Sequence, residues 1–207
     1  EIIRHVEAFE PRRVHEVFVR AAATLPPREL VYGLVVPLLQ RVGDRWERGE
    51  TTVIHEHVIS GHVKGLLGTF MRLVQVPEGA PRILCGSPEG HIHEFGALLA
   101  SLIALTRGVE AVFIGPDVPF AEIPAAAKRA RASLVVLSFM RSTNEEELVT
   151  LEEGVKKVAA VTDVWLGCPD GHEATKRNMP ARFFHDFESF DTALVSRFST
   201  PSMSVTG

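Results

Sequence analysis

The sequence predicts an α/β protein in which an N-terminal four-helix bundle precedes a doubly wound parallel sheet of the Rossmann-like, flavodoxin-like kind. Residues from about 10 to 76 carry apolar side chains at helical spacing, whereas residues from 81 onward alternate short apolar runs with amphipathic segments. The segment Val76-Pro-Glu-Gly-Ala-Pro81 between them has the composition of a linker. We therefore expect a helical domain at 1–76, a sheet domain at 81–198 and a disordered tail at 199–207.

Composition places the chain among ordinary globular proteins. Its 207 residues include 26 acidic and 22 basic groups, which gives a formal charge of −4. That balance argues against a surface that coats nucleic acid, and we expect no direct nucleic-acid binding by this segment. There is no apolar run of about 18 residues and no signal peptide at the first residue, so we expect a cytoplasmic protein without a membrane contact. Cys85 and Cys168 are expected to be free thiols.

The first part is predicted to contain helices at about 10–24, 27–35, 35–48 and 51–75. The second begins at the Pro26-Pro27 pair, and Pro37 is expected to interrupt the helical run. Gly49 ends the third helix, and Thr51 or Thr52 caps the fourth. Four side chains of the third helix form a predicted core-facing stripe at i, i+4, i+7 and i+11: Val35, Leu39, Val42 and Trp46.

The second part alternates strand and helix about five times, as a doubly wound sheet requires. Strands are expected at 82–86, 111–115, 134–139, 161–166 and 182–187. Helices are expected at 94–106, 121–130 and 144–159, with a short helix after Gly171 and a closing helix. Ligands of such sheets bind beyond the carboxyl ends of the strands.

Candidate site residues follow these strands. The first strand leads into a loop that holds His91 and His93, the second into Asp117 and Val118, the third ends at Ser138, and the fourth ends at Gly167 and Cys168. Ordinary turn chemistry accounts for glycine and serine at strand ends, and a loop histidine is often merely solvated. A zinc site would need further ligands, which are not found at a recognisable spacing.

In this order, the residues resemble the cobalamin-binding domain shared by methionine synthase, B12-dependent mutases, corrinoid methyl carriers and B12 photoreceptors. The family pattern is Asp/Glu-x-His-x-x-Gly, then a serine, then Gly-Gly. His93-Glu-Phe-Gly96, Ser138 and Gly167 match it. The resemblance implies that His93 binds cobalt and that the cofactor's displaced base lies near Gly96 and Ser138. It also implies cofactor contacts for the neighbouring residues of the four loops, namely His91, Asp117, Val118, Gly167 and Cys168.

Two positions depart from the family pattern. His91 stands where the family has the acid that orients the imidazole, and Glu89 or Glu94 is a candidate substitute. Cys168 stands where the family has the second glycine, which places a side chain where the cofactor's tail would pass.

A second motif lies in the helical part. Trp46, after nine intervening residues, is followed by Glu56 and His57. This Trp-x9-Glu-His trio resembles the motif of B12-dependent photoreceptors of the CarH type, in which the bundle caps the upper face of adenosylcobalamin. The alternative is that Trp46 is simply a core residue. In that family a histidine follows the tryptophan and binds cobalt after photolysis, but here Glu47 does, so His55, His57, His62 or water is left for that role.

A stripe of small residues runs along the fourth helix. His57, Gly61, Gly65 and Gly68 share one face, and each glycine costs a helix about 0.5 to 1 kcal/mol relative to alanine. Either another helix packs unusually close to this face, or a flat bulky group such as the cofactor lies against it.

These resemblances imply a light sensor and not an enzyme. Photolysis of adenosylcobalamin would shift the bundle relative to the sheet domain and change a homo-oligomer, a signalling partner or an output domain. A corrinoid methyl-carrier subunit of a methyltransferase system is the alternative, and a zinc protein or metal-free module is the third. Relatives called photocobilins also hold a bilin, so biliverdin beside the cobalamin stays open, given the aromatic segment 183–187.

Overall fold

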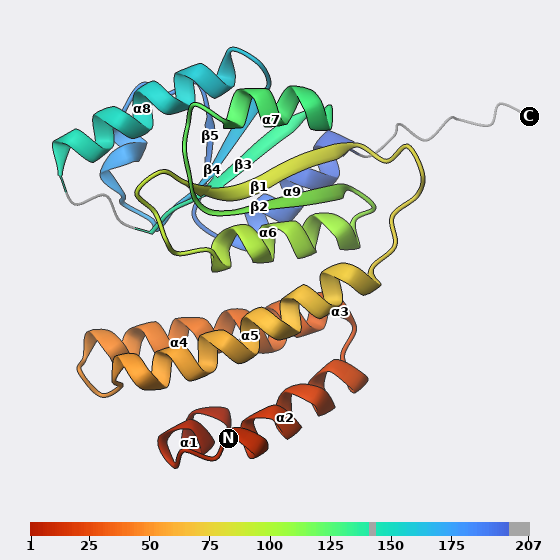
Figure 1. Cartoon of the computed structure of the whole chain (residues 1–207), viewed down its shortest axis with the longest axis vertical. Helices are drawn as coiled ribbons and strands as arrows, with labels where there is room; N and C mark the ends of the chain where they lie inside the picture. The colour runs from red at the N-terminus through yellow and green to blue at the C-terminus, as the bar shows by residue number, and fades with distance from the viewer. Residues whose placement is uncertain (141–143, 199–207) are drawn as a thin grey trace, which may run out of the picture. The chain divides into compact units, whose positions relative to one another are not determined.

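The computed structural model describes residues 1–140 and 144–198. The chain divides into two compact units, Glu1–Val74 and Gln75–Gly207 (Figure 1). The expected tail at 199–207 lies outside the described residues. Within the described ranges, no helix combines the length and the apolar character that a membrane span requires.

The first unit is all-helical. Its elements are α1 (Ile2–Glu7), α2 (Pro11–Thr24), α3 (Pro27–Glu29), the π-helical turn η1 (Leu30–Val35), α4 (Val36–Glu47) and α5 (Val53–Leu73). Two corrections follow. Helix α1 was not predicted, and the predicted interruption at Pro37 is wrong. The run α3–η1–α4 keeps helical backbone at both junctions, and the Val36 N–H donates to the Val31 carbonyl across the wider π turn. Pro37 then falls in the first turn of α4, where proline is tolerated.

The core of this unit lies along one face of α5, where Ile59, Val63, Leu67 and Phe70 are buried at spacings of a helical face. Buried side chains of the other helices complete it, namely Ile2, Val6, Val14, Phe18, Leu30, Val31, Val35, Leu38 and Val42. The predicted stripe is wrong at its end, because Trp46 is 53% exposed.

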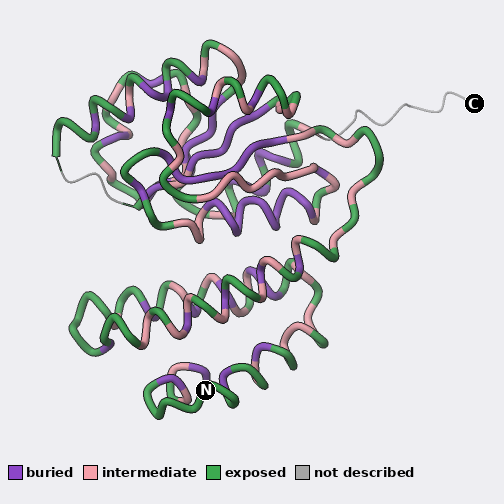
Figure 2. Tube along the Cα trace, viewed as in Figure 1, coloured by how far each residue is buried: buried purple, intermediate pink, exposed green. Residues whose placement is uncertain are grey.

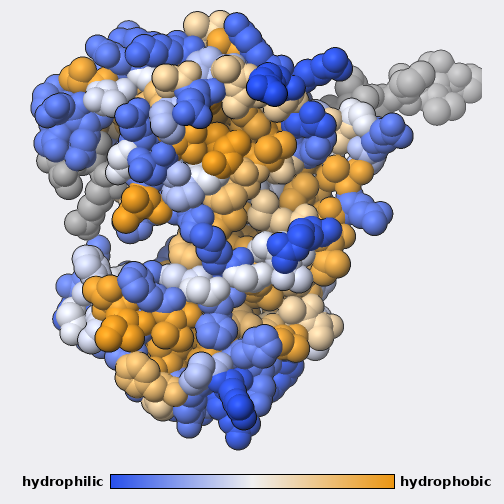
Figure 3. Space-filling model, in the orientation of Figure 1, coloured by the Kyte–Doolittle hydropathy of each residue, from blue (hydrophilic) through white to orange (hydrophobic). Residues whose placement is uncertain are grey.

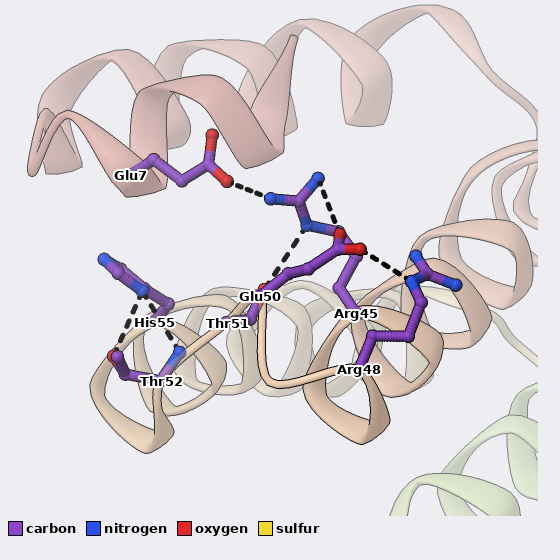
Figure 4. Close-up of polar contacts among 7 residues, drawn as sticks. All are labelled: Glu7, Arg45, Arg48, Glu50, Thr51, Thr52 and His55. Atoms are coloured by element: carbon purple, nitrogen blue, oxygen red, sulfur yellow. Dashed lines mark hydrogen bonds and ion pairs between the residues drawn. The ribbon is translucent and has the colours of Figure 1, made fainter.

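A polar network fixes the end of the unit where α4 turns into α5 (Figure 4). The guanidinium of Arg45 on α4 pairs with Glu7 of α1, and its Nε donates to Thr51 Oγ1 at 3.3 Å. Thr52 begins α5 with a capping box, in which His55 takes the part that Glu or Gln usually plays. These contacts tie α1, which was not predicted, to the tip of the helical pair.

The second unit is an all-parallel five-stranded sheet with the strand order β2-β1-β3-β4-β5, as predicted for the flavodoxin-like arrangement. Figure 1 shows α6 and α9 on one face and α7 and α8 on the other. The elements are β1 (Arg82–Pro88), α6 (Phe95–Thr106), β2 (Glu110–Val118), α7 (Ile123–Ala130), β3 (Leu134–Ser138), α8 (Glu145–Ala159), β4 (Asp163–Gly167), the 3-10 turn η2 (Glu173–Lys176), β5 (Arg182–Phe184) and α9 (Phe187–Phe198).

Burial follows this layering. Figure 2 shows the central strands and the length of α6 as buried, while α8 alternates between buried and exposed residues. Figure 3 shows hydrophilic side chains over α8, where Glu145, Glu146 and Glu147 begin the helix. Strands β1 and β3 are neighbours in the sheet, and the chain continues from β1 to β2 on one side and from β3 to β4 on the other. The strand order therefore reverses between the carboxyl ends of β1 and β3, where the candidate loops lie.

Candidate functional site

The loop between β1 and α6 carries the two candidate histidines, and their environments differ. His93 is exposed. His91 is only 7% exposed, and its ring packs against that of Phe139 with centroids 5.4 Å apart. Burial lowers the pKa of His91 from its ordinary value, so its neutral form is favoured. The view of His91 as a solvated loop side chain is therefore wrong, whereas His93 is free to present an imidazole outward.

Three predicted site residues meet at one point of the sheet edge. Ser138 on β3 pairs in register with Gly167 on β4. An added Cβ at Gly96, in the first turn of α6, would come within 2.0 Å of Ser138 Oγ. A Cβ at Gly167 would be 3.7 Å from the same oxygen. Gly96 therefore allows a close approach between the start of α6 and the end of β3, with the serine hydroxyl at the junction.

Cys168 directly follows β4 and is buried. It is 7% exposed and belongs to the hydrophobic cluster of the sheet unit. Its Sγ lies 3.9 Å from His185 Nδ1. Burial raises the pKa of the Cys168 thiol to about 11. Whether the Cys168 side chain obstructs the cofactor's tail stays a prediction of the sequence.

Asp117 and Val118 end β2 beside the histidine loop, and Val118 pairs in register with Pro88. Asp117 has a left-handed backbone, with φ of 53°. Its N–H donates to the His91 carbonyl at 3.0 Å, and its Oδ1 accepts the Gly90 N–H at 2.8 Å. The described contacts of Asp117 therefore hold the histidine loop.

The fold also brings in residues that the sequence did not single out. Ser87, fully buried near the end of β1, donates its hydroxyl to the His93 carbonyl at 2.8 Å. A serine within an otherwise apolar strand, just before a candidate loop, was the available signal. His172 also packs against Phe139, with ring centroids 5.1 Å apart in an edge-on arrangement. It precedes η2, so nothing local in the sequence relates it to His91.

In the helical unit, Glu56 and His57 form a direct pair. Glu56 Oε2 lies 2.7 Å from His57 Nδ1, and the other carboxylate oxygen accepts the Ser60 hydroxyl. The His57 side chain is 72% exposed, so the pair presents the imidazole at the surface with its orientation set by the carboxylate.

The glycine face of α5 is open. No atom among the described residues lies within 4 Å of a Cβ added at Gly61 or Gly65, and both residues are exposed. At Gly68, an added Cβ would meet only the end of the Arg72 side chain, at 3.5 Å. Unusually close packing of another helix of the same unit therefore does not explain the glycines at 61 and 65. Likewise, exposed Trp46 does not have the core role that its stripe predicted.

The described residues were also searched for metal sites made by the protein alone. No group of three or more His, Cys, Asp or Glu side chains in residues 1–140 and 144–198 is placed to hold a metal ion. The zinc alternative thus finds no ligand set in that part of the chain. A single exposed imidazole, by contrast, suits a metal that arrives with its other ligands, as in a corrinoid.

Comparisons with known proteins show what the chain is similar to. Residues 1–70 match the family model described as a B12 binding domain. The chain is 29% identical over 188 residues to the HTH-type transcriptional repressor CarH of Myxococcus xanthus, covering 89% of this chain and 62% of that protein. It is 26% identical over 165 residues to dimethylamine corrinoid protein 3 of Methanosarcina acetivorans, covering 75% of this chain and 76% of that protein.

A solved structure shares the fold. The monomethylamine corrinoid protein of Methanosarcina barkeri superposes with a TM-score of 0.69 at 14% identity, covering 95% of this chain and 96% of that one. Residues 1–70 thus match a B12 binding domain, and the whole chain shares the fold of a corrinoid protein. The predicted resemblance to the CarH group of B12-binding proteins is confirmed, and corrinoid proteins match as well. The chain spans less than two thirds of the length of the repressor.

Proposed function

We propose that this chain is a cobalamin-based light sensor that uses adenosylcobalamin, and that it is a binding protein and not an enzyme. The observation that carries the cofactor assignment is the meeting of Gly96, Ser138 and Gly167 at the same sheet edge as exposed His93. Gly96 has no room for a Cβ, Ser138 supplies a hydroxyl, and His93 presents an imidazole outward. Together they suit a cofactor that has a polar tail and a metal in need of one nitrogen ligand. When bound, adenosylcobalamin supplies a light-labile cobalt–carbon bond.

Each residue then has a task. His93 would offer its imidazole nitrogen to the cobalt of the bound cofactor. Ser138 donates or accepts a hydrogen bond at the tail, and Gly96 leaves room for it. The surroundings of these groups are formed by His91, Val118, Gly167 and Cys168. Because His91 and Cys168 are buried, we assign them to packing and not to polar contacts with the cofactor.

The helical unit is proposed to contact the upper side of the cofactor. Trp46 offers an exposed aromatic surface, the Glu56–His57 pair an oriented polar group, and Gly61 and Gly65 a flat backbone surface without side chains. For the role of a cobalt ligand after photolysis, His57 is the best placed, because its side chain is 72% exposed. The Nε2 atom of His55 is buried, and the His62 ring stacks on Phe18.

Loss of the adenosyl group would remove its contacts with Trp46 and His57, and this is the differential interaction that a two-state signal requires. We propose that the output is a change in homo-oligomeric state or in contact with a signalling partner, without direct nucleic-acid or membrane binding by this segment. One of the similar proteins, CarH of Myxococcus xanthus, is a transcriptional repressor by name, which favours a regulatory role.

A corrinoid methyl carrier is the second candidate, and the match to dimethylamine corrinoid protein 3 favours it. It would bind methylcobalamin and need a methyltransferase partner. The two candidates differ in the role of Trp46. The sensor needs it to recognise the adenosyl group, whereas the methyl carrier does not.

The experiment is an absorption spectrum of protein loaded with adenosylcobalamin in darkness and again after green light, for the wild type, His93→Ala and Trp46→Ala. The sensor predicts a bound dark spectrum that light changes, ligation that depends on His93, and weaker adenosylcobalamin binding with unchanged methylcobalamin binding in Trp46→Ala. Binding without a light response, with methylcobalamin preferred, would establish the methyl carrier instead. Biliverdin has no support in the comparisons; acid extraction and a far-red scan of the purified protein test for it.

A further inference from the structure

The imidazole that is proposed to bind cobalt stands on a short loop, residues 89–94, between β1 and α6. Because His93 is exposed, packing against a core does not fix its side chain. The position of the imidazole therefore depends on the backbone from which it projects. The loop's anchors decide how well a ligand on it can be preorganised.

One anchor comes from β1. Ser87 is fully buried, and its hydroxyl donates to the carbonyl of His93 itself at 2.8 Å. A buried hydroxyl with a made hydrogen bond is costly to displace, since the freed groups would lose their partner away from water. This contact holds the backbone at the residue that carries the imidazole.

The other anchor comes from β2. Asp117 makes two hydrogen bonds to the loop. Its N–H donates to the His91 carbonyl at 3.0 Å, and its Oδ1 accepts the Gly90 N–H at 2.8 Å. Its φ of 53° is in the left-handed region, which aspartate adopts more readily than most residues. Gly90 is also left-handed, with φ of 84°. The two anchors bracket the loop, one before His93 and one at it.

The position two residues before the ligand histidine, where the family pattern has an acid, is not a carboxylate in this chain. The residue two before it is His91, which packs against Phe139. Glu89 Oε2 accepts the Phe120 N–H at 3.4 Å and is thus directed to the loop after β2. Metal-binding histidines usually depend on an outer partner for their orientation, and here the backbone anchors are in a position to supply part of it.

We infer that Asp117 and Ser87 are positioning residues for His93, which hold the loop so that the imidazole meets cobalt, and that Asp117 acts through the loop and not as a contact of the cofactor. This inference rests on the proposed cobalamin site. It makes the side-chain acceptor of Asp117, and not its charge, the important property, because the group it holds is a neutral backbone N–H.

Four variants separate the parts of this inference. Asp117→Ala removes the acceptor, Asp117→Asn keeps a carbonyl oxygen as acceptor, and Asp117→Gly removes the acceptor while relieving the left-handed backbone. Ser87→Ala removes the second anchor. Asp170→Ala is the matched control, since Asp170 also accepts a glycine N–H, that of Gly171 at 2.9 Å, in a different loop.

The first readout is the electron paramagnetic resonance spectrum of cob(II)alamin bound to 15N-labelled protein. A protein imidazole splits the cobalt lines into doublets, whereas the cofactor's own unlabelled base gives triplets, so ligation by the chain is read directly. We expect doublets in the wild type, Asp117→Asn and Asp170→Ala. We expect the doublet fraction to fall at least threefold in Asp117→Ala, Asp117→Gly and Ser87→Ala, and to vanish in His93→Ala.

The second readout needs no cofactor. In Asp117→Ala and Asp117→Gly we expect amide hydrogen exchange at Gly90 to accelerate at least tenfold, with the β3 amides unchanged. Wild-type ligation in Asp117→Ala would overturn the inference, as would full recovery in Asp117→Gly or equal loss in Asp117→Asn. If the wild type itself gives no doublet that His93→Ala removes, the proposed cobalt ligand fails, and the inference fails with it in a distinguishable way.

Discussion

Replacing Gly96 with alanine tests the junction that carries the cofactor assignment. The new Cβ would lie 2.0 Å from Ser138 Oγ and 3.0 Å from Ser138 Cβ. The hydroxyl can rotate away, but the Cβ cannot, so the start of α6 or the end of β3 must shift. Overpacking of this kind costs about 1 to 3 kcal/mol, against a gain of up to about 1 kcal/mol for alanine over glycine in a helix. We expect a net loss of roughly 1 to 2 kcal/mol in the unfolding free energy of the sheet unit.

Urea denaturation followed by tryptophan emission measures this loss. Trp165 on β4 is 5% exposed and reports on the sheet unit, and a Trp46→Phe background removes the other tryptophan. Adding Ser138→Gly takes away both clashing atoms, so Gly96→Ala is then expected to be neutral or stabilising. The matched control is Gly61→Ala, which meets no atom within 4 Å and is expected to stabilise the helical unit by about 0.5 to 1 kcal/mol, measured by helical ellipticity. Wild-type stability in Gly96→Ala, or the same loss with Ser138→Gly present, would refute the close approach.

Three further predictions concern the sheet unit. Cys85 and Cys168, whose pKa values burial raises to about 12 and about 11, are expected to stay unreactive to a thiol reagent at about pH 8 until urea unfolds the unit; fast labelling of native protein would contradict this. Arg107→Ala removes two hydrogen bonds of 2.6 and 2.7 Å from the carboxylate of buried Asp191, and is expected to cost about 3 to 5 kcal/mol in the same urea assay; a loss below about 1 kcal/mol would show that the pair contributes little. Burial lowers the pKa of His172 in the folded state, so the unfolded chain binds more protons. The unfolding free energy therefore falls as the pH drops below 6.5, the ordinary pKa of histidine. His172→Asn keeps an acceptor for the Ala174 N–H and is expected to weaken this pH dependence.

The sheet unit was predictable because strong local patterns and one topological rule act together there. Short apolar runs alternating with amphipathic helices required a parallel sheet, and the rule for carboxyl ends then placed Ser138 and Gly167 at one edge. Their register pairing, and the approach of Gly96, follow from that order of strands. By contrast, the anchoring of the loop by Ser87 and Asp117 depends on side-chain hydrogen bonds across neighbouring strands, which no periodicity encodes.

The helical unit was harder to predict in detail. Proline usually ends a helix, and the π turn that absorbs Pro37 has no simple sequence signal. Helix α1 is short, and its place depends on long-range contacts such as the Glu7 pair with Arg45. The prediction that Trp46 faces the core was wrong for a different reason. The last turn of α4 extends beyond the core, and periodicity alone does not show where the helices that pack against α4 end.

The residues that local rules explain least are the ones on which the proposed function depends. Trp46 is a large aromatic left in solvent, Gly61 and Gly65 weaken a helix without admitting any neighbour, and His93 is an exposed imidazole on an anchored loop. Departures from local consistency concentrate at functional sites, because folding alone gives no reason to keep them. Since the side chains of Trp46 and His93 are not part of a core, each can be changed with little effect on folding. A large effect of Trp46→Ala or His93→Ala on cobalamin binding, at unchanged unfolding free energy, would therefore arise from the cofactor site itself.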